Sequence, residues 1–304
     1  MAYLLWASIV LCLIAGSAID KGNICLVRAA GSLSAGKPAK AVGILLITTC
    51  AALIFYLNSE FGLHRRAPLW FLPTLATFAG AVLFALGALL NDACAVGTLG
   101  RLARGDIGHI ATFAGAAAVG FLLPRAEVPH AMPDLALLGG GWPWLLAILA
   151  FTLLVLVLCR RHLGGADIRS FIVLGFVAAV VTDWQGNWTW LGLLQQAAAG
   201  VPPGYAGVAC LAAVIGGAVI GALWRGRFRL VRPDPKAMAR EFAGGGLMAS
   251  GAALIPGAND ALSVYFVPGG SPHAVAAYGV MFVVMLAVMR ARAILFRPRA
   301  VAEL

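Results

Sequence analysis

The chain has 304 residues, of which 62% belong to the apolar set AVILMFWYC and only 11% are charged, with a formal net charge of +10. A soluble domain of this length needs a large polar surface, with roughly a quarter of its residues charged. Together with a mean hydropathy of +0.93, these figures exclude disordered, fibrous and disulfide-framework proteins. They indicate an integral membrane protein and not a soluble enzyme.

Nine apolar stretches are each long enough to form a membrane-spanning helix, which needs about 20 residues. The first has no basic n-region and no cleavage pattern, so we expect a span there and not a signal peptide. Strand-like alternation is absent, which predicts an all-α membrane protein and excludes a β-barrel. The stretches are residues 2–19, 40–58, 69–90, 106–123, 142–159, 169–182, 206–224, 241–256 and 272–289.

The basic residues predict the orientation, because cytoplasmic loops hold the excess of Lys and Arg. With the N-terminus outside and the C-terminus in the cytoplasm, all but three of the 22 Lys and Arg fall on the inner side. The three on the outer side are Arg65, Arg66 and Arg125. The positive charge therefore follows the loops, which favours contact with anionic membrane lipid and argues against a nucleic-acid partner. The basic loop from Arg225 to Arg240 serves this topology or docks an acidic carrier partner.

The second half of the chain resembles the first when the sequence is shifted by 164 residues, a shift called the repeat spacing below. We infer a duplication with a first repeat at 1–141, a connecting span at 142–163 and a second repeat at 164–304. Since an odd number of spans precedes the second repeat, it enters from the opposite side, as in many transporters. Matching pairs include Phe78-Ala79-Gly80 with Phe242-Ala243-Gly244, Gly22-Asn23 with Gly186-Asn187, and His109 with His273.

Four segments interrupt the apolar pattern, at residues 20–25, 91–98, 183–189 and 255–260. Each contains Gly, Asn or Asp, which tolerate turns and helix ends. Each is followed by a stretch too short to cross a bilayer, so we expect loops with half-helices that dip into the protein from one face. Irregular backbone at this depth needs protein or water around it. The free N–H groups and positive dipole end of a half-helix suit an anion.

The breaks supply the candidate residues of a substrate path. The inner thiols are Cys25 and Cys94, since the loops that hold them enter from the cytoplasm under this topology. Burying an ionisable group at membrane depth is costly, so such a residue usually has a function. Asp92 and Asp260, which each follow an Asn, are therefore candidates, although both would also suit helix N-caps. The six cysteines have no CxxC pattern, so we predict no metal site. The sequence also lacks a catalytic triad and a phosphate loop, so we expect neither an enzyme with a cofactor nor an ATP-driven pump. The full set is Asn23, Cys25, Asp92, Cys94, Asn187, Thr189, Ala258, Asn259 and Asp260.

These segments resemble the YeeE/YedE family of bacterial inner-membrane transporters for sulfur compounds, over nearly the whole chain. The resemblance implies a pseudo-two-fold fold and a central path in which cysteine thiols pass a thiosulfate anion along by hydrogen bonds. It also implies a soluble sulfur-carrier protein of the TusA type as a cytoplasmic partner. The matching segments are Gly22-Asn23-Ile24-Cys25, Cys94 to Leu99 with Arg101-Leu102, Gly251-Ala252, and Pro256 to Asp260 with Pro268 and Ser271-Pro272.

The sequence departs from the family at one position. Cys25 and Cys94 match the two inner family cysteines, but Ala258 stands where the outer cysteine is expected. The sequence thus predicts import of thiosulfate or a related small sulfur-containing anion, by a mechanism with fewer thiols. Two alternatives stay open. One is a proton-coupled carrier of another metabolite that uses Asp260 and Asp92, and the other is a membrane-bound sulfur-relay subunit that forms a persulfide.

Other residues have simpler interpretations. We expect core packing for the cysteines inside apolar spans and interfacial capping, or proton relay, for His109 and His273. A tryptophan-rich segment around Thr189 suggests an interfacial aromatic belt. The run Gly244-Gly245-Gly246 predicts close helix packing. The cysteines are Cys12, Cys50, Cys159 and Cys210, and the tryptophans are Trp184, Trp188 and Trp190.

Overall fold

The computed structural model describes residues 2–63, 69–122, 132, 136–139, 141–164 and 167–295. The three arginines expected on the outer side lie outside these ranges. Within them the chain is helical, with one isolated bridge between Asp106 and Val231 as its only β-pairing. The helices of the first half are α1 (Ala2–Gly22), α2 (Leu26–Ser34), α3 (Ala39–Glu60), α4 (Leu75–Leu90), α5 (Ala95–Ala103), η1 (Ile107–His109) and α6 (Ile110–Leu122). Those that follow are η2 (Leu137–Gly139), α7 (Gly141–Cys159), η3 (Arg160–His162), α8 (Ile168–Gln185), α9 (Trp190–Ala198), α10 (Tyr205–Trp224), α11 (Pro235–Leu254), α12 (Asn259–Ala261), η4 (Leu262–Phe266) and α13 (Pro272–Leu295).

A helix stands at each of the nine predicted spans. Seven of the described helical segments are long and apolar enough to cross a membrane. The other two are the shorter apolar segment Ile107–Leu122 and α11, whose first turns carry charge. Helix α11 begins earlier than expected because Asp234 caps it and Pro235 occupies its first turn, which shortens the predicted basic loop. The prediction of an all-α membrane protein is confirmed.

The helix boundaries follow the repeat spacing. Helix α9 begins and ends one repeat spacing after α2, and the same shift relates the starts of α5 and α12 and the ends of α4 and α11. Counterpart helices also have counterpart neighbours. Helix α1 packs on α10, and its counterpart α8 packs on α3, the counterpart of α10. In the same way α4 packs on α13, and α11 packs on α6. Helix α1 also contacts its own counterpart α8, and α4 contacts α11. The division at 1–141 and 164–304 stays a prediction, which this pattern favours.

Helices α4 and α11 touch backbone to backbone. A methyl group at Gly87 would lie 2.7 Å from the carbonyl oxygen of Gly244, and one at Gly80 would lie 2.7 Å from that of Gly251. Since the order of partners is reversed, the two helices run antiparallel. Gly244 and Gly251 are the repeat counterparts of Gly80 and Gly87, so each glycine meets the counterpart of the other. This is the self-complementary contact expected at a two-fold axis, and it confirms the close packing predicted for Gly244-Gly245-Gly246.

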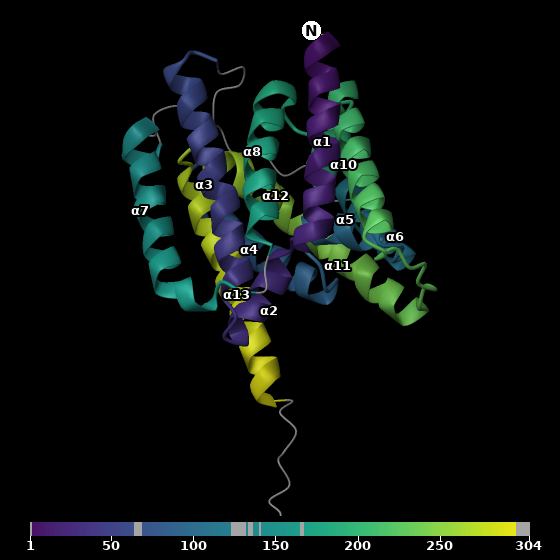
Figure 1. The fold of residues 1–304 in the computed structure, drawn as a ribbon. Coiled ribbons are helices and arrows are strands. Elements are labelled where there is room, and N and C mark those ends of the chain that lie inside the picture. The colour runs from purple at the N-terminus through teal and green to yellow at the C-terminus, as the bar shows by residue number, and fades with distance from the viewer. Residues whose placement is uncertain are drawn as a thin grey trace, which may run out of the picture.

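Helix α7 stands apart from the two halves. It lies at the outer edge of the bundle beside α3, which is the long helix that it contacts most (Figure 1). Only a small share of its surface is buried. The start of α1 and the end of α13 lie at opposite ends of the molecule (Figure 1), as an odd number of spans requires.

We expect Gly87→Ala to destabilise the protein by about 1–3 kcal/mol, the usual cost of an overpacked site. The methyl group would force α4 away from α11. The matched control is Gly279→Ala on α13, where an added methyl group meets nothing within 4 Å. Thermal unfolding of the detergent-purified protein measures both variants. A Gly87→Ala melting temperature equal to that of Gly279→Ala would show that this contact is not required.

Candidate functional site

Four short helical segments begin at the four predicted breaks. Their N-cap residues are Cys25, Cys94, Thr189 and Ala258, and all four have extended backbone. Cys25 corresponds to Thr189, and Cys94 to Ala258, at the repeat spacing. Three of these segments have nine residues, while α12 has three and continues into the π-helical turn η4. Each break thus ends in a helix N-terminus, where backbone N–H groups lack helical partners.

Cys25 and Cys94 are buried and cap each other's helices. The N–H of Leu26, at the start of α2, donates to Cys94 Sγ at 3.2 Å. The N–H of Cys94 donates to Cys25 Sγ at 3.5 Å, and the two thiols are within hydrogen-bonding reach of each other. Gly97 makes room for this arrangement, because a methyl group there would lie 2.6 Å from Cys25 Sγ. The structure therefore brings the two predicted thiols together.

Two cavities lie beside these helix ends. The larger has a volume of about 300 Å³, and its lining includes Asn187, Thr189 and Ala258. The smaller, of about 40 Å³, is lined by Cys25, Asn259 and Asp260 among others. A cavity of that size has room for only a few water molecules. Both cavities are lined by Trp188, Thr189 and Val264, so they adjoin each other.

Asn259 and Asp260 are buried at the start of α12. Asp260 Oδ1 accepts a hydrogen bond from the N–H of Ala261 at 2.8 Å. Asn259 Oδ1 has no hydrogen-bond partner among the described residues. A flip of the Asn259 side-chain amide exchanges its oxygen and its nitrogen, so the residue can present either an acceptor or a donor to the small cavity. A buried polar group without a partner is costly, and a polar ligand in the small cavity would relieve that cost.

Asp92 lies away from these cavities. Its side chain is 69% exposed and forms an ion pair with Arg101. Its φ of 52° is in the left-handed region, which Asn and Asp tolerate best among non-glycine residues. The residue one repeat spacing later is Pro256, also with a positive φ, so Asp92 is the repeat counterpart of Pro256 and not of Asp260. Asp92 forms the turn that leads into α5.

Asn23 forms the matching turn before α2, with a φ of 49°. Its Oδ1 accepts a hydrogen bond from Arg104 Nη1 at 2.9 Å, and Arg104 Nε donates to the fully buried Asp20 at 2.7 Å. Arg225 Nη1 donates to the other oxygen of Asp20 at 3.0 Å, and Arg227 donates to its backbone carbonyl. Three guanidinium groups thus surround one carboxylate and hold the loop before Cys25 in place.

The end of the bundle that carries Asp20, Arg104 and Arg225 is called the basic end below. Sequence reasoning counted these arginines only toward the orientation and missed their contacts. The available signal was Asp20, a charged residue at the start of the first break.

The tryptophans around Thr189 are not all interfacial. Trp188 and Trp190 are buried, so the aromatic-belt interpretation is wrong for these two. Trp190 Nε1 donates to the backbone carbonyl of Ala95 at 3.0 Å and ties α9 to α5. Trp188 Nε1 donates to Thr182 Oγ1 at 2.9 Å and lines both cavities. The two rings therefore belong to the walls between the helix ends.

The remaining cysteines and His273 have structural surroundings. Cys12 and Cys210 are buried in the hydrophobic core between α1 and α10, and all six cysteines are free. His273 lies edge-on to the rings of Phe71 and Phe266, and its Nδ1 is 2.7 Å from Ser271 Oγ.

We expect Asp20→Asn to lower stability by about 3 kcal/mol, the lower end of the range for breaking a buried ion pair. The lower end applies because the side chains of Arg104 and Arg225 are 21% and 27% exposed. Asp167→Asn is the control, since it removes an ion pair with Lys21 whose side chains are 24% and 50% exposed, and such pairs contribute under about 1 kcal/mol. Thermal unfolding in detergent compares them. Equal melting temperatures would contradict the assigned role of Asp20.

Comparison with known proteins identifies the family of the chain. The family model for sulphur transport matches residues 21–136 and 125–287, which include three of the four breaks and all of the first except Asp20. A search of curated proteins found no match to the chain. Because the two matches together cover most of the sequence, the chain belongs to the sulphur transport family and is a membrane transporter for a sulfur compound.

Proposed function

We propose that the protein is a permease of the bacterial inner membrane that imports thiosulfate or a related small sulfur-containing anion. The anion would enter the larger cavity, pass the small cavity beside Asn259, and leave past Cys25 and Cys94 at the basic end. The observation that carries this proposal is the small cavity, because helix N-termini from both halves of the chain border it. The positive-inside rule supports placing the basic end in the cytoplasm and the N-terminus outside.

Helix N-termini favour an anion at this point. Each presents backbone N–H groups and the positive end of a helix dipole. At three of the four breaks a side chain partly satisfies these groups, through the two cysteine sulfurs and through Thr189 Oγ1, which accepts from the N–H of Gly192. Ala258 has no such side chain, but Asp260 Oδ1 accepts from the N–H of Ala261 at the start of α12. When Asp260 is protonated, an anion would be the negatively charged partner of this helix start.

The thiols suit stepwise passage of a soft anion. Cys25 and Cys94 use their sulfur atoms as acceptors from backbone N–H groups. When one thiol donates to the other, the S–H group of the second is left as a donor to the anion. A thiol is a weak donor, so it contacts an anion without holding it tightly. Conduction requires successive sites of this kind. Without a cysteine at position 258, Asn259 would supply the polar contact at the start of α12.

Asp260 adds a condition to anion passage. An ionised carboxylate at the small cavity would repel an anion, so we infer that Asp260 is protonated when the anion passes. This links transport to a proton at one residue. The alternative proton relay through both aspartates is disfavoured, because Asp92 is exposed and paired with Arg101.

The basic end suits release toward an acidic partner. Around Asp20 the guanidinium charges exceed the carboxylate charge, and the segment that follows α10 adds further arginines. That segment is fixed to the turn after α5 by hydrogen bonds from the N–H of Arg229 to the carbonyl of Arg104 and from the N–H of Val231 to that of Gly105. We propose this surface as the docking site of a TusA-type carrier protein.

The main test is growth on thiosulfate as sole sulfur source of a bacterium that lacks its own thiosulfate importers. We expect the wild-type chain to restore growth and both Cys25→Ser and Cys94→Ser to abolish it, because a hydroxyl group is a shorter, harder donor than a thiol. Membrane expression of each variant is the control. Failure of the expressed wild type would exclude thiosulfate, and growth of both variants would exclude the thiol path. Sulfur retained on either cysteine after denaturation would favour the sulfur-relay alternative.

A second test separates the position of the Cys25 thiol from its chemistry. Gly97→Ala should lower thiosulfate uptake about tenfold, since displacing the sulfur by the added methyl group removes a hydrogen bond to the anion of roughly 1.5 kcal/mol. Gly100→Ala in the same helix is the control, because its methyl group would lie 3.6 Å from Ile19, an ordinary contact. Uptake of radiolabelled thiosulfate into proteoliposomes compares them. Equal rates would show that the position of Cys25 does not limit transport.

A further inference from the structure

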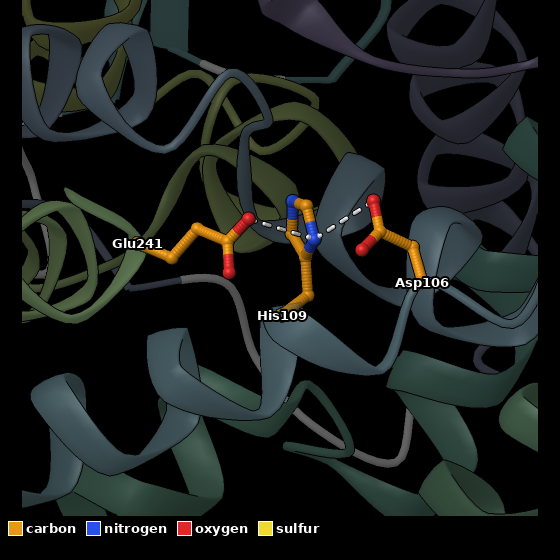
Figure 2. A group of neighbouring side chains, drawn as sticks. All are labelled: Asp106, His109 and Glu241. Atoms are coloured by element: carbon orange, nitrogen blue, oxygen red, sulfur yellow. Dashed lines mark ion pairs between the residues drawn. The ribbon is translucent and has the colours of Figure 1, made fainter. Parts of the chain in front are cut away.

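A second polar cluster lies at the basic end, outside the proposed path. Asp106 precedes η1, His109 closes η1 at the start of α6, and Glu241 lies on α11. Figure 2 shows the imidazole of His109 between the two carboxylates. His109 Nδ1 is 3.3 Å from Asp106 Oδ2 and 3.4 Å from Glu241 Oε1. The side chains of His109 and Glu241 are 2% and 11% exposed, and that of Asp106 is 25% exposed, so the imidazole is shielded from solvent while Asp106 lies at its edge.

The three side chains do not satisfy one another. Both carboxylates face the same nitrogen, and Nδ1 carries at most one hydrogen. Neither His109 Nδ1 nor Glu241 Oε2 has a hydrogen bond of acceptable geometry within the described residues. His109 Nε2 is also without a partner, and protonating it would bury another unpaired N–H. The buried carboxylate of Glu241 and the partly exposed one of Asp106, beside one buried imidazole, therefore leave room for a shared cation.

The separations fit a metal ion. Zinc binds histidine nitrogen at about 2.0–2.1 Å and carboxylate oxygen at about 2.0–2.2 Å, so two ligands of a tetrahedral site lie about 3.4 Å apart. Both measured separations from Nδ1 are close to this value. The three ligand atoms all lie within 4.8 Å of one another. One nitrogen and two oxygens form a donor set for a divalent transition-metal cation such as Zn²⁺.

The surroundings leave a fourth position open. A cavity of about 200 Å³ is lined by all three residues, and a methyl group at Gly108 would lie 3.1 Å from Glu241 Oε2. Arg101 approaches Asp106 Oδ2 to 3.6 Å and also pairs with Asp92. Glu241 has no ion pair with an arginine or lysine in the described part of the chain, although Arg232 and Arg240 line the cavity. Its charge is thus available to a metal.

We propose that Asp106, His109 and Glu241 bind one divalent transition-metal cation, with the open position facing this cavity. The cysteine pattern predicts no metal site, and this one contains no cysteine. The metal would join the start of α6 to α11. The metal would also be linked to α5, the helix that Cys94 caps, because Asp106 forms an ion pair with Arg101 on that helix.

The test is metal binding by the purified, chelator-treated full chain carrying an affinity tag without histidines. Co²⁺ should bind with one equivalent per chain and give the visible absorption of a four-coordinate site, and Zn²⁺ should displace it and raise the melting temperature. His109→Gln and Glu241→Gln should each weaken Zn²⁺ binding more than about tenfold. His273→Gln is the matched control, since His273 is the repeat counterpart of His109 but lies between aromatic rings.

Each outcome decides the proposal. Absence of Co²⁺ and Zn²⁺ binding by folded wild-type protein would overturn it, and so would binding that survives both His109→Gln and Glu241→Gln. Loss of binding in His273→Gln to the same extent would also overturn it, because the effect would then not depend on this cluster. If one variant fails to fold, the other variant and the wild-type spectrum still give the answer.

Discussion

The contact between α4 and α11 is the constraint on which the arrangement of the site depends. In a bilayer the hydrophobic effect does not drive helices together, so close packing through small residues takes its place. The glycines along this crossing let two antiparallel backbones touch. Helix α4 leads directly into the break that holds Cys94, and α11 leads into the break that holds Ala258. The crossing therefore fixes where α5 and α12 begin, and with them the helix ends at the small cavity.

The same four breaks show how buried backbone groups find partners without water. At Thr189 the solution is local, because its own hydroxyl oxygen caps α9. At Cys25 and Cys94 it is reciprocal, because each sulfur accepts from the loop of the other. At the fourth break the N-cap Ala258 has no polar side chain, and Asp260 Oδ1 accepts from the N–H of Ala261 instead. With Asp260 protonated, a passing anion would supply the negative charge at this helix start.

Much of the fold could be predicted, because apolar length is a direct consequence of the bilayer. The nine stretches, the repeat spacing and the four breaks needed no side-chain geometry. What failed depended on tertiary contacts. Trp188 and Trp190 have the composition of an interfacial belt, but they are buried because their N–H groups reach partners inside the bundle. Asp92 and Asp260 each follow an Asn, yet the residue one repeat spacing after Asp92 is Pro256. Asp92 and Pro256 share a positive φ, so the backbone conformation, and not the preceding Asn, shows which residues correspond. The arginine partners of Asp20 and the Glu241 partner of His109 come from distant segments, so spacing along the chain could not reveal them.

The isolated position of α7 has a consequence for how such a chain is made. It adds little to the core, yet in the predicted division of the chain it adds one crossing between two repeats of equal span number. Parity alone then decides whether the second half is inserted upright or upside down. A chain that lost this helix would keep the glycines of the α4 and α11 contact and both Cys25 and Cys94. The halves would then be inserted parallel, and α4 and α11 could no longer cross as antiparallel helices. Among the seven described candidate spans, the one with the smallest buried share therefore sets the relative orientation of the two halves.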